Sequence, residues 1–134
     1  RAADMRLSVF ELVTLASLVE KEARFEEDRG IIAQVFLERL RIGMPLQSDT
    51  TIQYLLHAPK EDVTFADTEI ASPYNTYQHI GLPPGPIANP GTASLEAVLY
   101  PADTDYLYFV ADREGHNHYS RTYSDHLALV EQVR

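Results

Sequence analysis

The apolar positions near the start of the chain follow a helical period. Ser8 and Glu11 form the pattern of a capping box, and an apolar series begins directly behind them. The members of this series are Leu12, Val13, Leu15, Ala16, Leu18 and Val19. Because they cover more than half of the circumference at 3.6 residues per turn, the pattern predicts a helix that its neighbours largely bury.

A second amphipathic pattern begins after a polar interruption. The cluster EEDRG at 26–30 separates the two, and the apolar positions behind it are Ile31, Ile32, Val35, Phe36 and Leu40. Gly43, with Pro45 behind it, is typical of the end of a helix. The next segment, PLQSDTTIQYLL at 45–56, favours a turn or a short helix, with Asp49 able to cap the residues behind it.

The chain changes character between Ala58 and Pro101. Seven of the eight prolines lie there, so we expect mostly irregular structure with one short helix at 93–99. Behind it, DYLYFVAD and HNHYSR predict the two strands of a hairpin, and Thr122 can cap a final helix. Two helices, a long ordered loop rich in Pro and Gly, a β-hairpin and a C-terminal helix predict an α+β fold in one domain, residues 1–134.

Composition narrows the classes of function. A chain of 134 residues is about one domain. Its 20 acidic and 11 basic residues give a net charge of −9 with no run of Lys and Arg, so nucleic acid is not an expected partner. The absence of Cys excludes a thiol nucleophile, a cysteine-ligated zinc site and disulfides. No apolar run approaches the roughly 18–20 residues of a membrane span.

Two acids at the end of the first helix are candidates for proton transfer. Glu20 and Glu22 lie at opposite edges of the apolar arc, and Ala16 and Ala23 leave space beside Glu20. A partly buried carboxyl has a raised pKa and can donate a proton near neutral pH. Acids at such a border commonly just face water, and the helical wheel does not choose between the two.

The loop SPYNTYQHIGLPPGPIANPG at 72–91 is a candidate binding surface. Pro restricts the backbone and Gly permits turns, which predicts a rigid loop. Its polar and aromatic side chains suit contact with a sugar: Tyr74, Asn75, Thr76, Tyr77 and Asn89. The alternative is a connector that packs on the core. His116 and His118 could share a strand face, but without an evident third ligand we expect no metal and no other cofactor.

Four segments together resemble the YceG-like family, the endolytic murein transglycosylases. They are LASLVEKEA at 15–23, VFLERLRIGMPLQSDTTIQY at 35–54, YNTYQHIGLPPGPIANPG at 74–91 and YLYFVADREGHNHYSRTYSDH at 106–126. The match keeps order and spacing over nearly the whole chain. Members of the family carry a membrane helix and a LysM-like region before the catalytic domain. The resemblance therefore implies that this chain is the catalytic domain of a longer, membrane-anchored protein, without the anchor.

The resemblance also assigns roles to residues. The first acid of the family's VEKE element is the catalytic one, which corresponds to Glu20. The LQSD element implies that Gln47, Ser48 and Asp49 line a substrate cleft, and the loop element implies the same for the five loop residues named above. The HNHYS element adds His118 near that cleft.

The implied reaction is lytic cleavage of peptidoglycan glycan strands. In that reaction a single Glu acts as general acid and then as base, while the C6 hydroxyl of the muramyl sugar attacks C1 to form a 1,6-anhydromuramyl end. Two alternatives stay open: a lysozyme-like muramidase in which an acid such as Asp49 positions water, and a non-catalytic peptidoglycan-binding module. The expected partners are peptidoglycan and cell-wall synthesis proteins, at the extracytoplasmic face of the bacterial inner membrane, with membrane contact only through the anchor.

Overall fold

The computed structural model describes residues 5–57 and 63–133. Within them the chain forms helices and a two-stranded antiparallel hairpin, so the predicted α+β fold is confirmed. The elements are α1 (Val9–Glu22), α2 (Glu26–Ile42), α3 (Asp49–Leu56), the 3₁₀ turn η1 (Asp67–Glu69), α4 (Thr92–Leu99), β1 (Tyr108–Ala111), β2 (Asn117–Ser120) and α5 (Tyr123–Val133). None of the helices in these two ranges is long and apolar enough to cross a membrane.

Helix α1 begins at the predicted capping box. The Ser8 hydroxyl accepts a hydrogen bond from the Glu11 N–H at 3.0 Å, and the Glu11 carboxylate accepts one from the Ser8 N–H at 3.0 Å. Its apolar series is buried as the pattern predicts, with Leu15, Leu18 and Val19 fully inaccessible to solvent.

Helix α2 is longer than its apolar pattern indicates. The acidic cluster that was expected to interrupt the helices forms the first turn of α2, which begins at Glu26. Carboxylates in a first turn interact favourably with the positive end of the helix dipole, so a polar cluster there extends a helix rather than breaking it. Asp28 is further held by the Tyr119 hydroxyl at 2.6 Å. The helix ends at Gly43, with φ 75°, as predicted.

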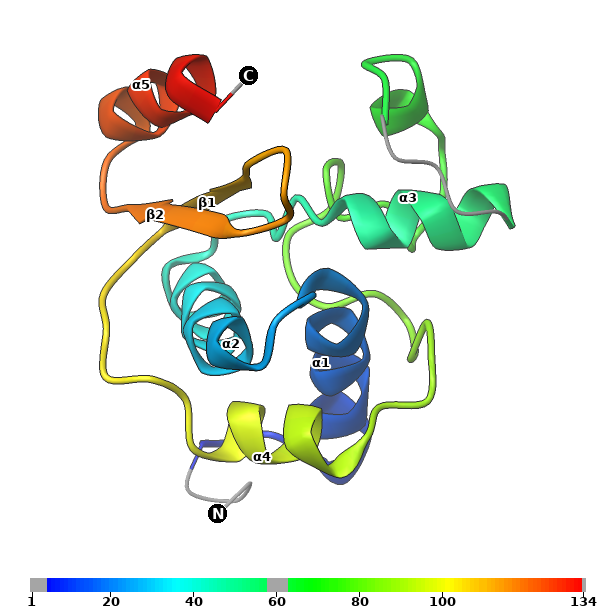
Figure 1. Ribbon diagram of the computed structural model, residues 1–134. Coiled ribbons are helices and arrows are strands. Elements are labelled where there is room, and N and C mark those ends of the chain that lie inside the picture. Colours follow the sequence, from blue (N-terminus) through cyan, green and yellow to red (C-terminus); the bar gives the residue numbers. More distant parts are fainter. Residues whose placement is uncertain (1–4, 58–62, 134) are drawn as a thin grey trace.

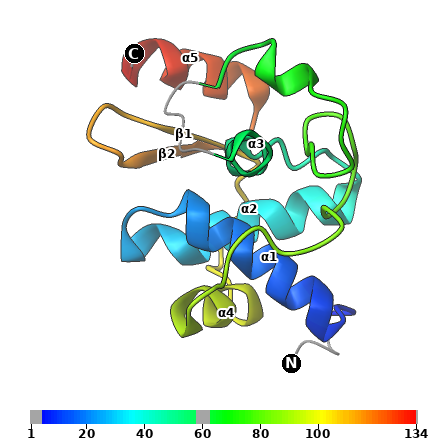
Figure 2. The same cartoon turned by 90° about the vertical axis from the view of Figure 1, so that its right-hand side faces the viewer.

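The helices and the hairpin form stacked layers (Figure 1). Helices α1 and α2 pack side by side, and α4 crosses both of them. The hairpin lies on the opposite side of this helical layer from α4, and α5 covers the outer face of the hairpin, as the second view also shows (Figure 2). Helix α3 contacts α1 beside the hairpin, so the end of α1 lies where these layers meet.

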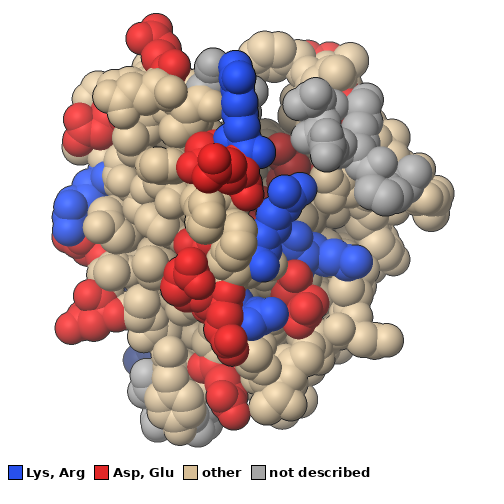
Figure 3. Space-filling view, viewed as in Figure 1, with Lys and Arg blue, Asp and Glu red and all other residues tan. Residues whose placement is uncertain are grey.

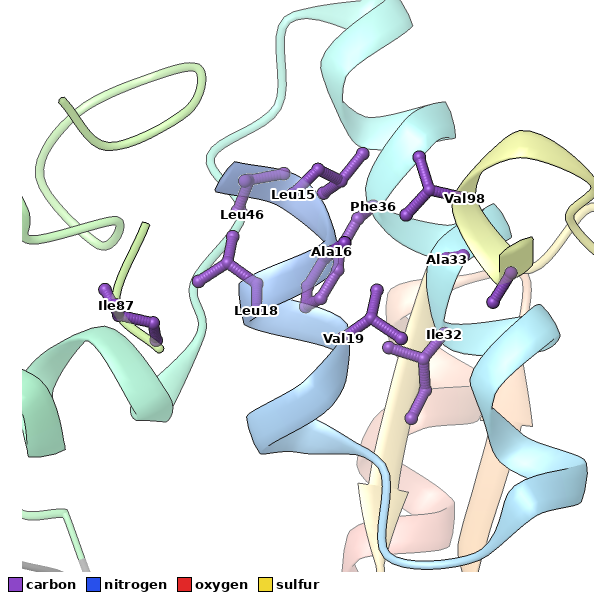
Figure 4. Packing of buried hydrophobic residues seen from close by; sticks show 11 residues of the cluster. Leu15, Ala16, Leu18, Val19, Ile32, Ala33, Phe36, Leu46, Ile87 and Val98 are labelled. Atoms are coloured by element: carbon purple, nitrogen blue, oxygen red, sulfur yellow. The ribbon is translucent and has the colours of Figure 1, made fainter. Parts of the chain in front are cut away.

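The core joins α1, α2, α4 and the irregular segments (Figure 4). Leu15, Leu18 and Val19 of α1 face Ile32 and Phe36 of α2. Three further members anchor other segments on this pair: Val98 of α4, Leu46 before α3 and Ile87 of the Pro-rich loop. Burial of apolar surface thus holds both candidate segments, 46–49 and 72–91, against α1.

The hairpin and α5 agree with the sequence pattern, although the strands are shorter than expected. Tyr108 pairs with Ser120 and Val110 with His118, and the connecting turn contains Gly115 with φ 90°. The Thr122 hydroxyl accepts a hydrogen bond from the Asp125 N–H at 3.2 Å, which confirms the predicted cap of α5.

Candidate functional site

Glu22 is the last residue of α1 and its side chain is half-buried. Burial, together with the negative charge of Asp49, raises the pKa of Glu22 to about 7. Hydrogen bonding from Ser48 and the charge of Arg39 act in the opposite direction but do not outweigh the burial. A carboxyl with this pKa is protonated in a large fraction of molecules at neutral pH, so it can act as a general acid and, once ionised, as a general base.

The Glu22 carboxylate is held by a hydroxyl cluster at the start of α3. The Ser48 hydroxyl donates to Glu22 Oε2 at 2.8 Å and lies 2.6 Å from the Thr50 hydroxyl. Ser48 is itself fixed by the loop at 75–77, because its N–H donates to the Thr76 hydroxyl at 2.9 Å. Thr51 links the two segments through contacts with Ser48 O at 2.9 Å and the Thr76 hydroxyl at 3.0 Å.

Asp49 and Tyr77 form a second polar pair across the same two segments. The Tyr77 hydroxyl donates to Asp49 Oδ1. Burial, followed by the Asp49 carboxylate, raises the pKa of Tyr77, so the phenol stays protonated and remains a donor. The charge of Asp49 contributes to the raised pKa of Glu22, which makes the pair part of the electrostatics of this site.

Arg39 of α2 supports the segment that leads into this cluster. Its guanidinium is buried, donates to the backbone oxygens of Leu46 and Leu107, and lies over the Tyr108 ring with its Cζ 5.6 Å from the centroid. These contacts hold the backbone ahead of Ser48 and place a positive charge on the Glu22 side of α2.

Glu20 has a different environment, two residues earlier on α1. Its Oε1 accepts hydrogen bonds from the Gly91 N–H and the Ser94 hydroxyl, both at 2.9 Å. Gly91 is the N-cap position of α4 and has no side chain of its own, so Glu20 supplies the missing cap from another helix. The Gly91 bond, then the Ser94 bond, lowers the pKa of Glu20. Glu20 therefore stays ionised at neutral pH and ties α1 to α4.

The family of the chain is established by comparison with known proteins. Residues 1–132 match the YceG-like family over nearly the full length of the chain. The chain belongs to the YceG-like family. A crystal structure of a YceG-like protein from Listeria monocytogenes superposes with a TM-score of 0.89 at 46% sequence identity, over 96% of this chain and 42% of that one.

Two similar curated relatives are named endolytic murein transglycosylase. The one from Bacillus subtilis (strain 168) is 50% identical over 127 residues, which cover 95% of this chain and 35% of the relative. The one from Streptococcus pneumoniae serotype 2 (strain D39 / NCTC 7466) is 44% identical over 126 residues, which cover 90% of this chain and 23% of the relative. The chain thus spans about a third or less of the length of these relatives.

The YceG-like domain buries several of the residues that were expected to contact a sugar. Asn75 is fully buried, and its amide donates to Thr68 O at 3.0 Å and to Ile70 O at 2.7 Å. Thr76 and Ser48 are each 1% exposed. Asn75 holds the loop, and Thr76 holds Ser48, which in turn holds Glu22. The expectation that they line a substrate cleft stays a prediction, and in this structure their polar atoms bond within the protein.

The other predicted contact residues lie nearer the surface. Gln47 is exposed next to Ser48, with a positive φ of 50°, and its N–H donates to Thr76 O at 3.2 Å. Tyr74 is half-buried against the core and lies 5.1 Å from the Tyr54 ring, centroid to centroid. Asn89 is exposed, before the Gly91 that binds Glu20. Gln47 is therefore an exposed predicted contact residue that is adjacent along the chain to Ser48, which holds Glu22.

The two hairpin histidines have separate partners. His118 Nε2 lies 3.0 Å from Asp112 Oδ2, and the His116 ring stacks on Phe25 with centroids 4.1 Å apart. Across residues 5–57 and 63–133, no group of three or more His, Asp or Glu could hold a metal ion. His118 is thus a partner of the hairpin turn, and nothing in its contacts links it to Glu22.

Three residues of this site were not predicted from the sequence: Thr50, Thr51 and Arg39. They support Glu22 from elements that are distant from it along the chain. The available signal was the run of hydroxyl residues in QSDTT, because hydroxyls so concentrated at a helix start exceed what one cap needs.

Proposed function

We propose that this domain cleaves the MurNAc–GlcNAc bond of peptidoglycan glycan strands as an endolytic transglycosylase, with Glu22 rather than Glu20 as its proton donor. The observation that carries the proposal is the Glu22 carboxyl, whose pKa of about 7 suits a group that must both give and take a proton. Glu20 lacks this property because its hydrogen bonds to α4 lower its pKa. The names of the relatives support the reaction class.

The proposed reaction uses one carboxyl twice. Protonated Glu22 gives its proton to the glycosidic oxygen, and the bond between that oxygen and C1 of the muramyl sugar breaks with its electron pair on the oxygen. The C6 hydroxyl of the same sugar then bonds to C1, and the Glu22 carboxylate takes the hydroxyl proton. The products are a free GlcNAc hydroxyl and a 1,6-anhydromuramyl end. No water is consumed, and Glu22 returns to its protonated form.

The surroundings of Glu22 fit this cycle. The Ser48 hydroxyl can donate to the ionised carboxylate at 2.8 Å and thereby fixes its orientation between the two proton transfers. A hydrolase would need a second carboxylate to activate water. Asp49 is the acid whose charge acts on Glu22, but it accepts the Tyr77 hydroxyl, which disfavours it as a base for water.

The substrate implies where the domain acts. Peptidoglycan lies outside the cytoplasmic membrane, so we place the domain at the extracytoplasmic face of that membrane, held there by an anchor outside this sequence. Tethering would raise its local concentration at the strands. Proteins that synthesise the cell wall would work on the same strands and are the proposed protein partners.

Product analysis in isotopically labelled water tests the proposed reaction. Glycan strands digested in water enriched in ¹⁸O should yield new muramyl ends that carry no label and are one water lighter than hydrolysis products. Labelled, reducing muramyl ends would identify a hydrolase instead. Binding of strands without any cleavage by the folded domain would identify a peptidoglycan-binding module.

A further inference from the structure

Several cations of this acidic domain have no ion pair with any described acid. Arg29 pairs with Glu26, Arg41 with Glu38 and Arg121 with Asp105, and the buried Arg39 donates to backbone oxygens. Among the remaining described cations, Arg6 precedes α1, Lys21 and Arg24 lie at its far end, and Arg113 lies in the hairpin turn; the last three are called the cationic cluster below. All three are exposed.

Contacts between the α1–α2 connection and the hairpin turn bring Arg24 and the turn that carries Arg113 together. The Arg24 side chain lies against Gly115: a Cβ atom at that glycine would be 2.8 Å from Arg24 Cδ and 3.0 Å from Nη1. The neighbouring Phe25 ring stacks on His116. The turn that carries Arg113 is thereby docked beside Arg24. Figure 3 shows basic side chains following one another down the middle of this face, with acidic side chains to either side.

Stabilisation of the helix dipole does not account for the whole cluster. Lys21, in the last turn of α1, interacts favourably with the negative end of the helix dipole. Arg24 and Arg113 lie outside the helices and have no such role. Lys21 and Arg24 lie one position before and two positions after Glu22 along the chain. We therefore place the cluster beside the proposed reaction centre, where it can meet a charged part of the substrate.

We infer that the cationic cluster binds carboxylates of the peptides attached to the muramyl sugars, and that it makes the domain favour strands whose peptides carry free carboxylates. This inference rests on the proposed function. In a peptide-bearing strand the sugar backbone is uncharged, because the muramyl carboxyl is consumed in the peptide linkage, so the anionic groups belong to the peptides. A guanidinium binds a carboxylate through two parallel hydrogen bonds, and an ammonium binds it as a point charge.

The test compares two forms of one substrate. Strands with acetylated peptide amines are assayed before and after their peptide carboxyls are converted to methylamides, which leaves the sugars unchanged. For the unmodified domain we expect KM to be about tenfold lower on the carboxylate form, since each exposed ion pair contributes only a few-fold. The triple variant K21Q/R24Q/R113Q should lose this difference. Added salt should weaken the preference of the unmodified domain.

Matched variants separate recognition from folding. R121Q removes a cation that is paired with Asp105 and should keep the preference, as should Arg24→Lys. Glu114→Gln removes an exposed acid beside Arg113 and should lower KM on the carboxylate form. If the triple variant fails to fold, Arg113→Gln alone should reduce the preference about two- to threefold, because its side chain is exposed on the turn.

The possible outcomes distinguish a failure of this inference from a failure of the proposed function on which it rests. Failure of the unmodified domain to cleave either form would contradict the proposed function. Equal KM values on the two forms would overturn the inference while the function stands. An equal rise of KM on both forms in the triple variant would also overturn it, by indicating a structural role. If the triple variant lost binding to anionic lipid vesicles but kept the substrate preference, the cluster would be a membrane-binding site, and the inference would be overturned as well.

Discussion

At the scale of single residues, two acids on one helix have pKa values shifted in opposite directions, because different segments of the chain contact them. Glu20 meets donors at the start of α4 and is stabilised in its charged form. Glu22 is half-buried near another acid, Asp49, and is stabilised in its neutral form. The helical wheel identifies both as border positions, but the groups that separate them are 26 and 74 residues away along the chain, at Ser48 and Ser94. Local periodicity carries no information about such partners.

The raised pKa of Glu22 predicts a stability change that can be measured without substrate. A Glu has an ordinary pKa of 4.5, so the folded state binds this proton more tightly than the unfolded state. That stabilisation is complete below about pH 4.5 and is lost as the pH rises through about 7. Above this range the ionised carboxylate costs about 3 kcal/mol, at about 1.4 kcal/mol per pKa unit. Glu22→Gln should therefore be more stable than the unmodified domain at pH 8, as urea unfolding can show, with the difference shrinking toward pH 5.

The variant Glu20→Gln should change the stability at pH 8 in the opposite direction to Glu22→Gln. The lowered pKa of Glu20 stabilises the fold above its ordinary value of 4.5 and ceases to do so as the pH falls through the folded value. This variant should be less stable at pH 8, by about 1 kcal/mol for a lost cap. A loss of stability at pH 8 in Glu22→Gln would contradict the environment described for Glu22.

Ser48 is predicted to tune the pH dependence of the reaction. Its hydrogen bond lowers the pKa of Glu22, so Ser48→Ala should raise that pKa further. The loss of activity at alkaline pH, which reflects ionisation of the proton donor in the free enzyme, should then move to higher pH in a profile of kcat/KM. Thr50→Ser keeps the neighbouring hydroxyl and should leave the profile in place. A shift to lower pH in Ser48→Ala would rule out this role.

At the scale of elements, sequence pattern predicts starts and stops well where the signal is local. The capping box of α1, the Gly43 end of α2 and the Thr122 cap of α5 all involve residues within a few positions of one another. The pattern is less informative for the acidic start of α2, where polarity alone suggested a break. It is least informative for the loop at 72–91, because a buried Asn and an exposed one look alike in sequence.

Asn75 is predicted to hold the loop rather than the substrate. Its side chain makes three hydrogen bonds, to Thr68 O, Ile70 O and the Tyr77 N–H. Asn75→Ala should reduce the free energy of unfolding by about 2–3 kcal/mol, since buried groups lose their partners. Thermal unfolding should show this loss, whereas Asn89→Ala, at an exposed position, should change the melting temperature little. An unchanged melting temperature with a raised KM in Asn75→Ala would restore the sugar-contact interpretation.

At the scale of the whole molecule, the candidate site exists only because distant segments meet at the end of α1. The segment at 46–51 and the loop at 75–77 bring the hydroxyls and the Asp49–Tyr77 pair, and the hairpin turn brings Arg113 to Arg24. The sequence has no run of Lys and Arg, yet the fold brings two basic residues that are far apart along the chain to neighbouring segments. Resemblance to the family indicated these segments, and its assignment of the catalytic role to Glu20 stays a prediction beside our proposal of Glu22.

Removal of metals is predicted to leave the reaction intact. The proposed proton transfers use Glu22 alone, and the parts of the chain at 5–57 and 63–133 contain no cluster suited to a metal. Cleavage of strands should proceed at the same rate in excess EDTA as in its absence. A loss of activity that zinc or another divalent ion restores would contradict this.

The central claim is that Glu22 is the one carboxyl that cycles the proton. Its most direct test is the initial rate of strand cleavage by Glu22→Gln and Glu20→Gln, measured side by side at pH 7 on domains whose circular dichroism matches that of the unmodified domain. An amide cannot cycle a proton, so Glu22→Gln should be at least about 100-fold slower, and Glu20→Gln should stay within about tenfold of the unmodified rate. An inactive Glu20→Gln beside an active Glu22→Gln would contradict the account and return the catalytic role to Glu20.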